Sequence, residues 1–203
     1  MQLKVCGMRD PVNMQALAEV GPDWVGLIFY PASKRYAGNL DPDSIKQTYF
    51  KKKVGVFVNS SVEEILTIVH KYRLDLVQLH GDEDLDFVKT LHEKGIEIIK
   101  VFRVTDSLPN DLSDFSPYVT LFLFDTYKKE TYGGTGIPFD WSILSNYSSK
   151  TSYLLSGGIG EEELEKLLSM HLPGCIGIDV NSAVEVRPGL KSIEKVKAIK
   201  SKL

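Results

Sequence analysis

The sequence contains few of the residues that make disulfide frameworks and metal sites. Its 203 residues include only two cysteines, Cys6 and Cys175, and four histidines. Two thiols so far apart do not make a disulfide framework in a chain of this size, and the scattered histidines lack the spacing of metal ligands. We therefore expect reduced thiols and no metal site.

An excess of positive charge and a long apolar run are also missing. The 24 basic and 27 acidic residues give a formal net charge of -3. Nucleic-acid binding usually needs a basic face, so we expect no nucleic-acid partner. No apolar run reaches the roughly 18 residues of a membrane helix, and the start of the chain is too short and polar for a signal peptide. These absences predict a cytoplasmic protein that does not associate with membranes.

Short β-branched and aromatic runs recur along the chain, with helical patterns between them. The strand candidates, spaced by roughly 20 to 35 residues, are Leu3–Cys6, Val25–Phe29, Val54–Val58, Leu76–Leu79, Glu97–Val101, Thr120–Phe124, Tyr153–Leu155 and Ile176–Asp179. Strict βα alternation favours a parallel sheet, and eight units predict a single-domain (β/α)8 TIM barrel over residues 1–203. A doubly wound open sheet is the alternative, although it would more often show a glycine-rich fingerprint where Cys6-Gly7-Met8-Arg9 stands.

The helix signals between these strands vary in strength. Asp10 and Asp41 each precede a proline suited to the first helical turn. Asp140 is placed to cap a helix over Trp141–Tyr147. Residues 106–117 hold two prolines and little periodicity, so we expect a short or irregular helix there.

In a barrel of this kind the active site lies at the C-terminal ends of the strands. Polar residues collect where the apolar runs stop, and some of them are expected only to end a strand in a polar loop. These residues are Cys6, Asn59, Gln78, His80, Arg103, Asp125, Ser156, Asp179 and Asn181.

Cys6 and Asp125 are the candidate proton-transfer groups. Lys4 precedes Cys6 by two positions, so both side chains leave the first strand on its inner face. The nearby cation would lower the thiol pKa, whereas the alternative is that Cys6 is a small buried apolar residue. Asp125 ends an apolar strand, where partial desolvation would raise its pKa and suit it to donate a proton. It could instead cap the next loop or pair with Lys4.

Asp179 is expected to pair with Lys4, since the first and last strands are neighbours in a closed barrel. Gly177, on the same face, would leave room for the lysine. The loops at Gly157-Gly158 and Asn181-Ser182 follow the seventh and eighth strands, where this fold usually binds phosphate.

Two further loops suit a ligand. Residues 30–36 form a basic, aromatic loop that would accommodate an anionic aromatic molecule, or would simply be exposed. Residues 132–136, Tyr-Gly-Gly-Thr-Gly, are predicted to form a lid.

These motifs resemble the phosphoribosylanthranilate isomerase family of tryptophan biosynthesis over essentially the whole chain. The matching stretches are Lys4–Gly7, Gly26–Pro31, Ser33–Tyr36, Val54–Asn59, Val77–Gly81, Asp125, Gly133–Gly136, Phe139–Trp141, Leu155–Ile159 and Asp179–Ser182. Two departures are Ala183, where many members have glycine, and Ser192, where the family usually has aspartate. Alanine at position 183 restricts the backbone of the predicted phosphate loop slightly more than glycine would. Serine at position 192 can still cap the last helix, so a small structural effect is expected there.

The resemblance implies an Amadori rearrangement of N-(5-phosphoribosyl)anthranilate, with Asp125 as general acid and Cys6 as general base. It implies that Arg35 binds the anthranilate carboxylate, with His80 and Asp179 also binding substrate. The phosphate would lie on Gly157, Gly158, Asn181 and Ser182. No cofactor is implied, because the imine formed from the substrate's own amine serves as the electron sink. The family resemblance leaves open a monomer or a homodimer.

Two other functions remain possible on the sequence. Another phosphosugar isomerase or epimerase would be expected to use two carboxylates or a clustered metal site, in place of a thiol. A non-catalytic phosphate-binding module would not need the candidate acid and base.

Overall fold

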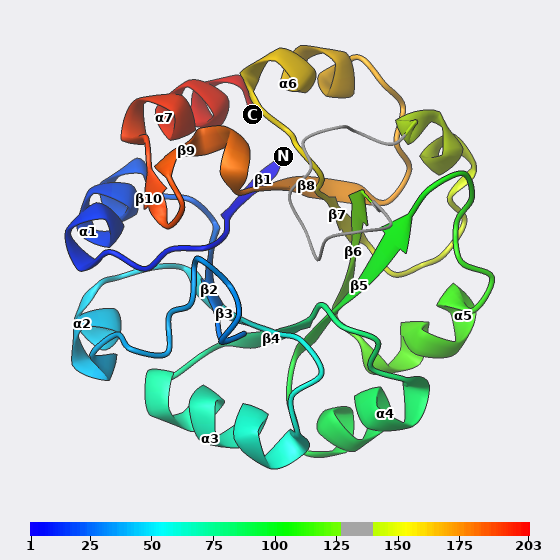
Figure 1. The fold of residues 1–203 in the computed structure, drawn as a ribbon. Coiled ribbons are helices and arrows are strands. Elements are labelled where there is room, and N and C mark those ends of the chain that lie inside the picture. The colour runs from blue at the N-terminus through cyan, green and yellow to red at the C-terminus, as the bar shows by residue number, and fades with distance from the viewer. Residues whose placement is uncertain (127–139) are drawn as a thin grey trace.

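Eight parallel strands close into a barrel in sequence order, and β8 is hydrogen-bonded to β1 (Figure 1). The structure is a computed structural model that describes residues 1–126 and 140–203. The barrel strands are β1 (Gln2–Val5), β2 (Trp24–Ile28), β3 (Lys52–Phe57), β4 (Leu76–Leu79), β5 (Ile98–Val104), β6 (Leu121–Thr126), β7 (Tyr153–Leu155) and β8 (Cys175–Val180). The predicted (β/α)8 barrel is confirmed, and the alternative of an open sheet is wrong.

Helices and short helical turns surround the barrel (Figure 1). They are α1 (Pro11–Val20), α2 (Pro42–Gln47), α3 (Val62–Tyr72), α4 (Leu85–Glu93), α5 (Leu112–Phe115), η1 (Ser116–Tyr118), η2 (Trp141–Asn146), α6 (Glu161–Leu168), η3 (Ser182–Val184) and α7 (Ile193–Lys202). A small hairpin of β9 (Glu185–Arg187) and β10 (Leu190–Lys191) lies between η3 and α7. The fifth unit is short, as predicted. The prediction of a regular helix after Asp140 is wrong, because this segment forms only the 3₁₀ turn η2.

Side-chain caps explain where several of the helices begin. The Asp10 carboxylate accepts a hydrogen bond from the Asn13 N–H at 2.8 Å, and Pro11 occupies the first helical turn of α1. Asp41 caps α2 and Ser192 caps α7 in the same way. Each cap satisfies an amide that has no partner within its helix, so the helix starts predicted at Asp10 and Asp41 are confirmed.

Apolar side chains form two separate layers. One cluster fills the inside of the barrel and consists of Val54, Leu76, Ile99, Val101, Leu121, Leu123 and Leu154. A larger cluster, which includes Leu3 and Val5, lies between the strands and the helices. Because neighbouring side chains on a strand point to opposite faces, Lys4 lies inside the barrel, as expected.

The strands β5 and β6 extend further toward the mouth than the apolar pattern predicted. Arg103 is paired in register with Asp125, and both are strand residues. The polar side chains begin before the backbone hydrogen bonding ends, so hydropathy alone placed these strand ends too early. Asp125 is therefore held by the sheet itself.

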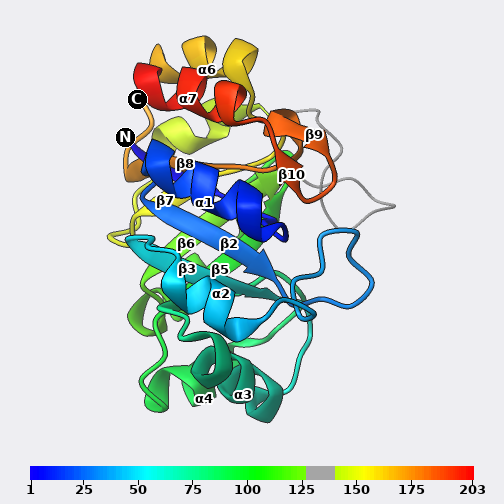
Figure 2. The same ribbon diagram turned by 90° about the vertical axis from the view of Figure 1, so that its left-hand side faces the viewer.

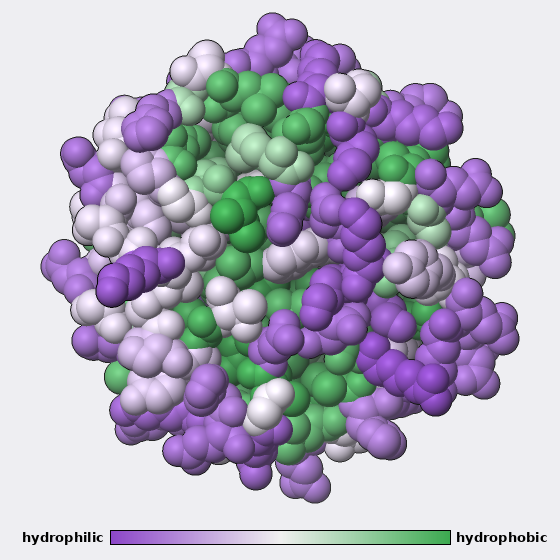
Figure 3. All heavy atoms as spheres, turned by 180° about the vertical axis from the view of Figure 1, so that it is seen from behind, coloured by the Kyte–Doolittle hydropathy of each residue, from purple (hydrophilic) through white to green (hydrophobic). Residues whose placement is uncertain are grey.

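The two ends of the barrel differ. Figure 2 shows that the loop after β2 and the β9–β10 hairpin project from one end, whereas both chain termini lie at the other. Seen from that second end, hydrophilic residues predominate around the rim of the molecule (Figure 3). None of the helices in residues 1–126 and 140–203 has the length and apolar character needed to cross a membrane.

Asp23 joins several elements at the end of the barrel that holds the termini. Its carboxylate accepts hydrogen bonds from the Leu3 N–H at 3.0 Å, from Lys51 Nζ at 2.7 Å and from Lys200 Nζ at 3.1 Å. Burial opposes ionisation, but the bonds from Lys51, Leu3 and Lys200 override it and lower the pKa of Asp23 to about 2. Asp23 thus links β1, the residue before β3 and α7.

We expect Asp23→Asn to lower the free energy of unfolding by about 1 kcal/mol at pH 7, because solvent screens part of these interactions. A lowered carboxylate pKa gives stability that is complete above the ordinary value of 3.8 and is lost as the pH falls through about 2. Urea unfolding at pH 7, 4 and 2 should show the difference from wild type shrinking with acidity. The exposed Asp106→Asn is the control, and a difference that stayed constant with pH would contradict this account.

Candidate active site

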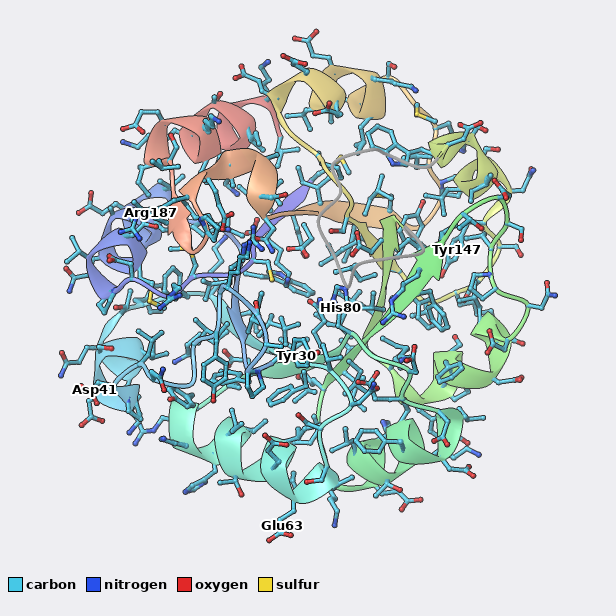
Figure 4. All side chains as sticks on the ribbon, viewed as in Figure 1. Tyr30, Asp41, Glu63, His80, Tyr147 and Arg187 are labelled. Carbon is cyan, nitrogen blue, oxygen red and sulfur yellow. The ribbon has the colours of Figure 1, made fainter. Side chains whose placement is uncertain are left out.

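A cavity of about 570 Å³ opens at the C-terminal ends of the barrel strands. Its lining includes all the predicted site residues, namely Cys6, Arg35, His80, Asp125, Gly157, Gly158, Asp179, Asn181 and Ser182. In Figure 4 the labelled His80 and Tyr30 lie inside the ring of helices, whereas Asp41 and Glu63 lie at its periphery. The fold therefore brings together groups that are distributed over most of the sequence.

Cys6 is the first residue after β1, and its N–H donates to the Val180 carbonyl at 2.9 Å. Its side chain is only 4% exposed. A Cβ on Gly26 of β2 would lie 2.7 Å from the Cys6 sulfur, so the glycine leaves the space that the thiol occupies. Burial raises the pKa of Cys6, and the charges of Lys4 and Lys191 oppose that shift only in part. The expected lowering of the pKa by Lys4 is outweighed by the loss of water around the thiol.

Lys4 and Asp179 form a buried ion pair below the cavity. The Lys4 Nζ lies 2.9 Å from the Asp179 Oδ1, and the two residues are in register on β1 and β8. Burial opposes the charged form of Lys4, but the Asp179 carboxylate overrides it and keeps the pKa of Lys4 raised. The predicted pairing is confirmed.

The reason predicted for Gly177 is wrong. A Cβ at this position would lie 2.3 Å from the backbone oxygen of Gln2, not against the Lys4 side chain. Gly177 is therefore needed for the close approach of the β1 and β8 backbones.

Asp125 is buried at the mouth and contacts His80. The His80 Nε2 lies 3.3 Å from the Asp125 Oδ2. The other ring nitrogen, Nδ1, lies 2.9 Å from the Gln78 side-chain nitrogen. If the amide donates there, His80 carries its proton on Nε2 and can donate it toward Asp125. This chain of contacts, which begins on β4, orients the carboxyl group at the end of β6.

The predicted phosphate loops have a constrained backbone. Gly157 and Gly158 both have positive φ values, 96° and 74°, which favour glycine over other residues. On the other loop, the Asn181 side-chain oxygen accepts a hydrogen bond from the Lys191 Nζ at 2.7 Å. Both loops line the cavity, at the position where this fold usually binds phosphate.

Arg35 is held by Glu185 through two hydrogen bonds. Its Nε lies 2.8 Å from one carboxylate oxygen and its Nη2 lies 2.6 Å from the other. A Cβ on Gly7 would lie 2.7 Å from the Arg35 Cδ, so this glycine makes room for the arginine stem. Arg35 reaches the cavity with its guanidinium already fixed by an acidic partner.

Sequence reasoning missed the buried groups that support the ligand-facing residues. Lys191 is fully buried, and its backbone exchanges two hydrogen bonds with the Asn13 side chain, at 2.8 and 2.9 Å. Glu185 binds both Lys191 and Arg35. These partners are far apart in sequence, so no local pattern indicates the contacts. The one indication in the sequence was that Glu185 and Lys191 follow closely after the predicted phosphate loop at Asn181-Ser182.

Other strand-end residues support the loop after β4. The Asn59 side chain accepts from the Asp82 N–H at 2.8 Å, and Arg103 donates to the His80 carbonyl at 2.9 Å. The buried Glu83 accepts from Lys100 at 3.0 Å in the same region. The predicted lid at residues 132–136 lies outside the described residues. Within the described part of the chain, no group of three His, Cys, Asp or Glu side chains is arranged as metal ligands are.

This fold and site define a (β/α)8-barrel enzyme whose cavity combines a thiol, a carboxyl group and loops suited to anions. The family model for N-(5'-phosphoribosyl)anthranilate (PRA) isomerase matches residues 3–202. The chain therefore belongs to the phosphoribosylanthranilate isomerase family, and it is an isomerase.

Individual relatives agree with this assignment. The chain is 41% identical over 201 residues to N-(5'-phosphoribosyl)anthranilate isomerase of Parabacteroides distasonis, covering 97% of this chain and 90% of the relative. It superposes on the crystal structure of the Thermotoga maritima phosphoribosylanthranilate isomerase with a TM-score of 0.82 and 31% identity, covering all of both chains. It is also similar to a phosphoribosylanthranilate isomerase solved in complex with reduced 1-(o-carboxyphenylamino)-1-deoxyribulose 5-phosphate. That match has a TM-score of 0.78, 30% identity and coverage of 99% and 97%.

Proposed function

We propose that this chain converts N-(5-phosphoribosyl)anthranilate into 1-(2-carboxyphenylamino)-1-deoxyribulose 5-phosphate by general acid–base catalysis. The observation on which the proposal mainly rests is that Cys6 and Asp125 line one cavity with Arg35 and the two glycine- and asparagine-containing loops. The relative solved with a reduced product analogue supports the same choice of ligand. The site thus offers an acid, a base and binding groups for the two anionic ends of the substrate, its carboxylate and its phosphate.

Asp125 is assigned the role of general acid. It protonates the ring oxygen of the ribose, the bond between that oxygen and C1 breaks, and the nitrogen lone pair forms the C1 imine. The carboxyl group is held by the sheet at the end of β6 and contacts His80, so it is fixed before the substrate arrives. Fixed geometry of this kind favours proton transfer at the reacting atom.

Cys6 is assigned the role of general base. Its thiolate takes the proton from C2, the electrons move toward the imine nitrogen, and the resulting enolamine tautomerises to the ketone. Burial raises the pKa of Cys6, and the positive charges of Lys4 and Lys191 limit that rise, so these two lysines favour loss of the thiol proton. Cys6 follows β1 and Asp125 lies on β6; these two strands are not neighbours in the barrel, so the two groups approach the substrate from different sides.

The remaining residues bind the substrate. Arg35 binds the anthranilate carboxylate, and His80 and Asp179 also bind the substrate. Gly157, Gly158, Asn181 and Ser182 bind the phosphate, by backbone N–H groups and short polar side chains. The placement of all these residues around the same cavity supports these roles.

The proposal also covers the partners, the oligomeric state and the cellular location of the enzyme. The small phosphorylated substrate is its main partner, and the protein acts as a monomer or homodimer in the cytoplasm, without a nucleic-acid or membrane partner. A similar phosphoribosylanthranilate isomerase of Thermotoga maritima is dimeric, which supports the homodimer as one of the two states.

The test is a turnover assay with freshly prepared phosphoribosylanthranilate, followed by loss of its anthranilate-type fluorescence. Wild type should consume the substrate, and the double variant Cys6→Ser/Asp125→Asn should be reduced to the background rate. Turnover that survived in the double variant would refute the assigned mechanism. A folded wild type without turnover would refute the proposed reaction and leave a phosphosugar-binding barrel.

A further inference from the structure

The Glu185 carboxylate has an unusually complete set of donors. One oxygen accepts from Arg35 Nε at 2.8 Å, from Lys191 Nζ at 2.8 Å and from the Gly189 N–H at 2.9 Å. The other oxygen accepts from Arg35 Nη2 at 2.6 Å. Burial alone would raise the pKa of Glu185, but hydrogen bonds from Arg35, Lys191 and Gly189 lower it, so the group stays ionised. Glu185 is therefore a fixed negative charge beside the cavity.

The contact with Glu185 determines which edge of Arg35 remains for a ligand. The guanidinium uses Nε and Nη2, which form one of its two-nitrogen edges, to bind Glu185. The edge formed by Nη1 and Nη2 remains for a second carboxylate, and no residue of the described chain accepts a hydrogen bond from Nη1. An arginine can bind a planar carboxylate through two parallel hydrogen bonds only when such an edge faces it.

Lys191 and the hairpin hold Glu185 in place. The Lys191 side chain is fully buried and also donates to the Asn181 side-chain oxygen at 2.7 Å. Glu185 begins β9, whose partner strand β10 contains Lys191. The carboxylate thus has little freedom to follow Arg35 if the guanidinium turns, and the arginine is held in one orientation.

We propose that Glu185 is a positioning residue that presents the Nη1–Nη2 edge of Arg35 to the substrate, and so makes the enzyme select an aromatic amine that carries a carboxylate. This inference rests on the proposed function. Glu185 does not touch the reacting atoms, and its effect passes through Arg35. Its loss should therefore weaken recognition of the carboxylate and leave a substrate analogue without that group unaffected.

The test compares two ligands that differ only in the carboxylate, N-(5-phosphoribosyl)anthranilate and N-(5-phosphoribosyl)aniline. The KM of the first and the inhibition constant of the second are measured for wild type, Glu185→Gln, Glu185→Asp and the exposed control Glu162→Gln. Glu185→Gln should raise the KM for the anthranilate compound by about 10-fold or more, because a charged hydrogen-bond acceptor is lost. The inhibition constant of the aniline compound should change less than 2-fold, and Glu162→Gln should match wild type.

Glu185→Asp, which has a shorter side chain, should also raise the KM for the anthranilate compound, but by a smaller factor. It keeps a negative charge opposite Lys191, so it still tests the proposal if Glu185→Gln does not fold. In an Arg35→Lys background, Glu185→Gln should add no further loss of discrimination. Equal weakening for both ligands, or unchanged KM, would overturn the positioning role. Absence of turnover by wild type in the same assay would instead count against the proposed function, so the two failures are distinguishable.

Discussion

Asp125→Asn should lower kcat/KM for phosphoribosylanthranilate by about 10²- to 10⁴-fold, the usual contribution of a general acid. Asparagine has nearly the shape of aspartic acid but cannot release the proton that the ring oxygen must receive. The sheet pairing of Asp125 with Arg103 involves the backbone, so the variant should keep its fold. The loss should fall on kcat with little change in KM, since the proton is transferred only in the transition state.

The matched control for this measurement is Asp86→Asn, which removes a carboxylate from the exposed surface of α4. It should retain activity within about 2-fold of wild type, because surface substitutions away from the site have small effects. An Asp125→Asn enzyme with near wild-type kcat would exclude Asp125 as the acid. His80, which contacts Asp125 at 3.3 Å, would then be the next group to substitute.

Lys4→Met should destabilise the protein by about 3 to 5 kcal/mol, because it leaves the Asp179 charge buried without its partner. Lys4 is fully buried, and its 2.9 Å contact with Asp179 joins the first and last strands at the point where the barrel closes. Burying an unpaired charge is more costly than losing the pair as a whole. Urea unfolding measures the difference in free energy.

The double variant Lys4→Met/Asp179→Leu separates these two effects. It removes both charges and fills the space with apolar atoms, so it should recover most of the stability that the single variant loses. The exposed Lys197→Met on α7 is the control and should stay within about 0.5 kcal/mol of wild type. A single variant as stable as wild type, or a double variant less stable than the single one, would contradict this account of the buried pair.

Strand positions and capping residues were largely predictable, because each depends on neighbours in the sequence. Asp10 caps α1 through the amide of Asn13, only three residues away. Hydropathy located every barrel strand but placed the end of β6 before Asp125, since the hydrogen bonds to β5 continue after the side chains become polar. Asp140 does cap the segment that follows it, but that segment is the 3₁₀ turn η2 and not an α-helix.

Which residues line the cavity could be predicted from the sequence, because a closed parallel barrel brings all the strand ends to one mouth. The pairing of Lys4 with Asp179 followed from the same closure. The electrostatic balance at Cys6 did not follow, since desolvation depends on the packing around the thiol, including the space left by Gly26. The orientation of Arg35 by Glu185 joins residues 150 positions apart and had no local signature.

The sequence by itself determined the order of the βα units, the inward face of each strand and the residue types that reach the mouth. These features depend on the periodicity of side chains along the backbone and on local hydrogen bonds. Only the tertiary structure decided which charges are buried together, in which direction burial shifts the pKa of Cys6 and which edge of Arg35 binds Glu185. Those properties depend on distances and water exclusion between segments that meet only when the barrel closes.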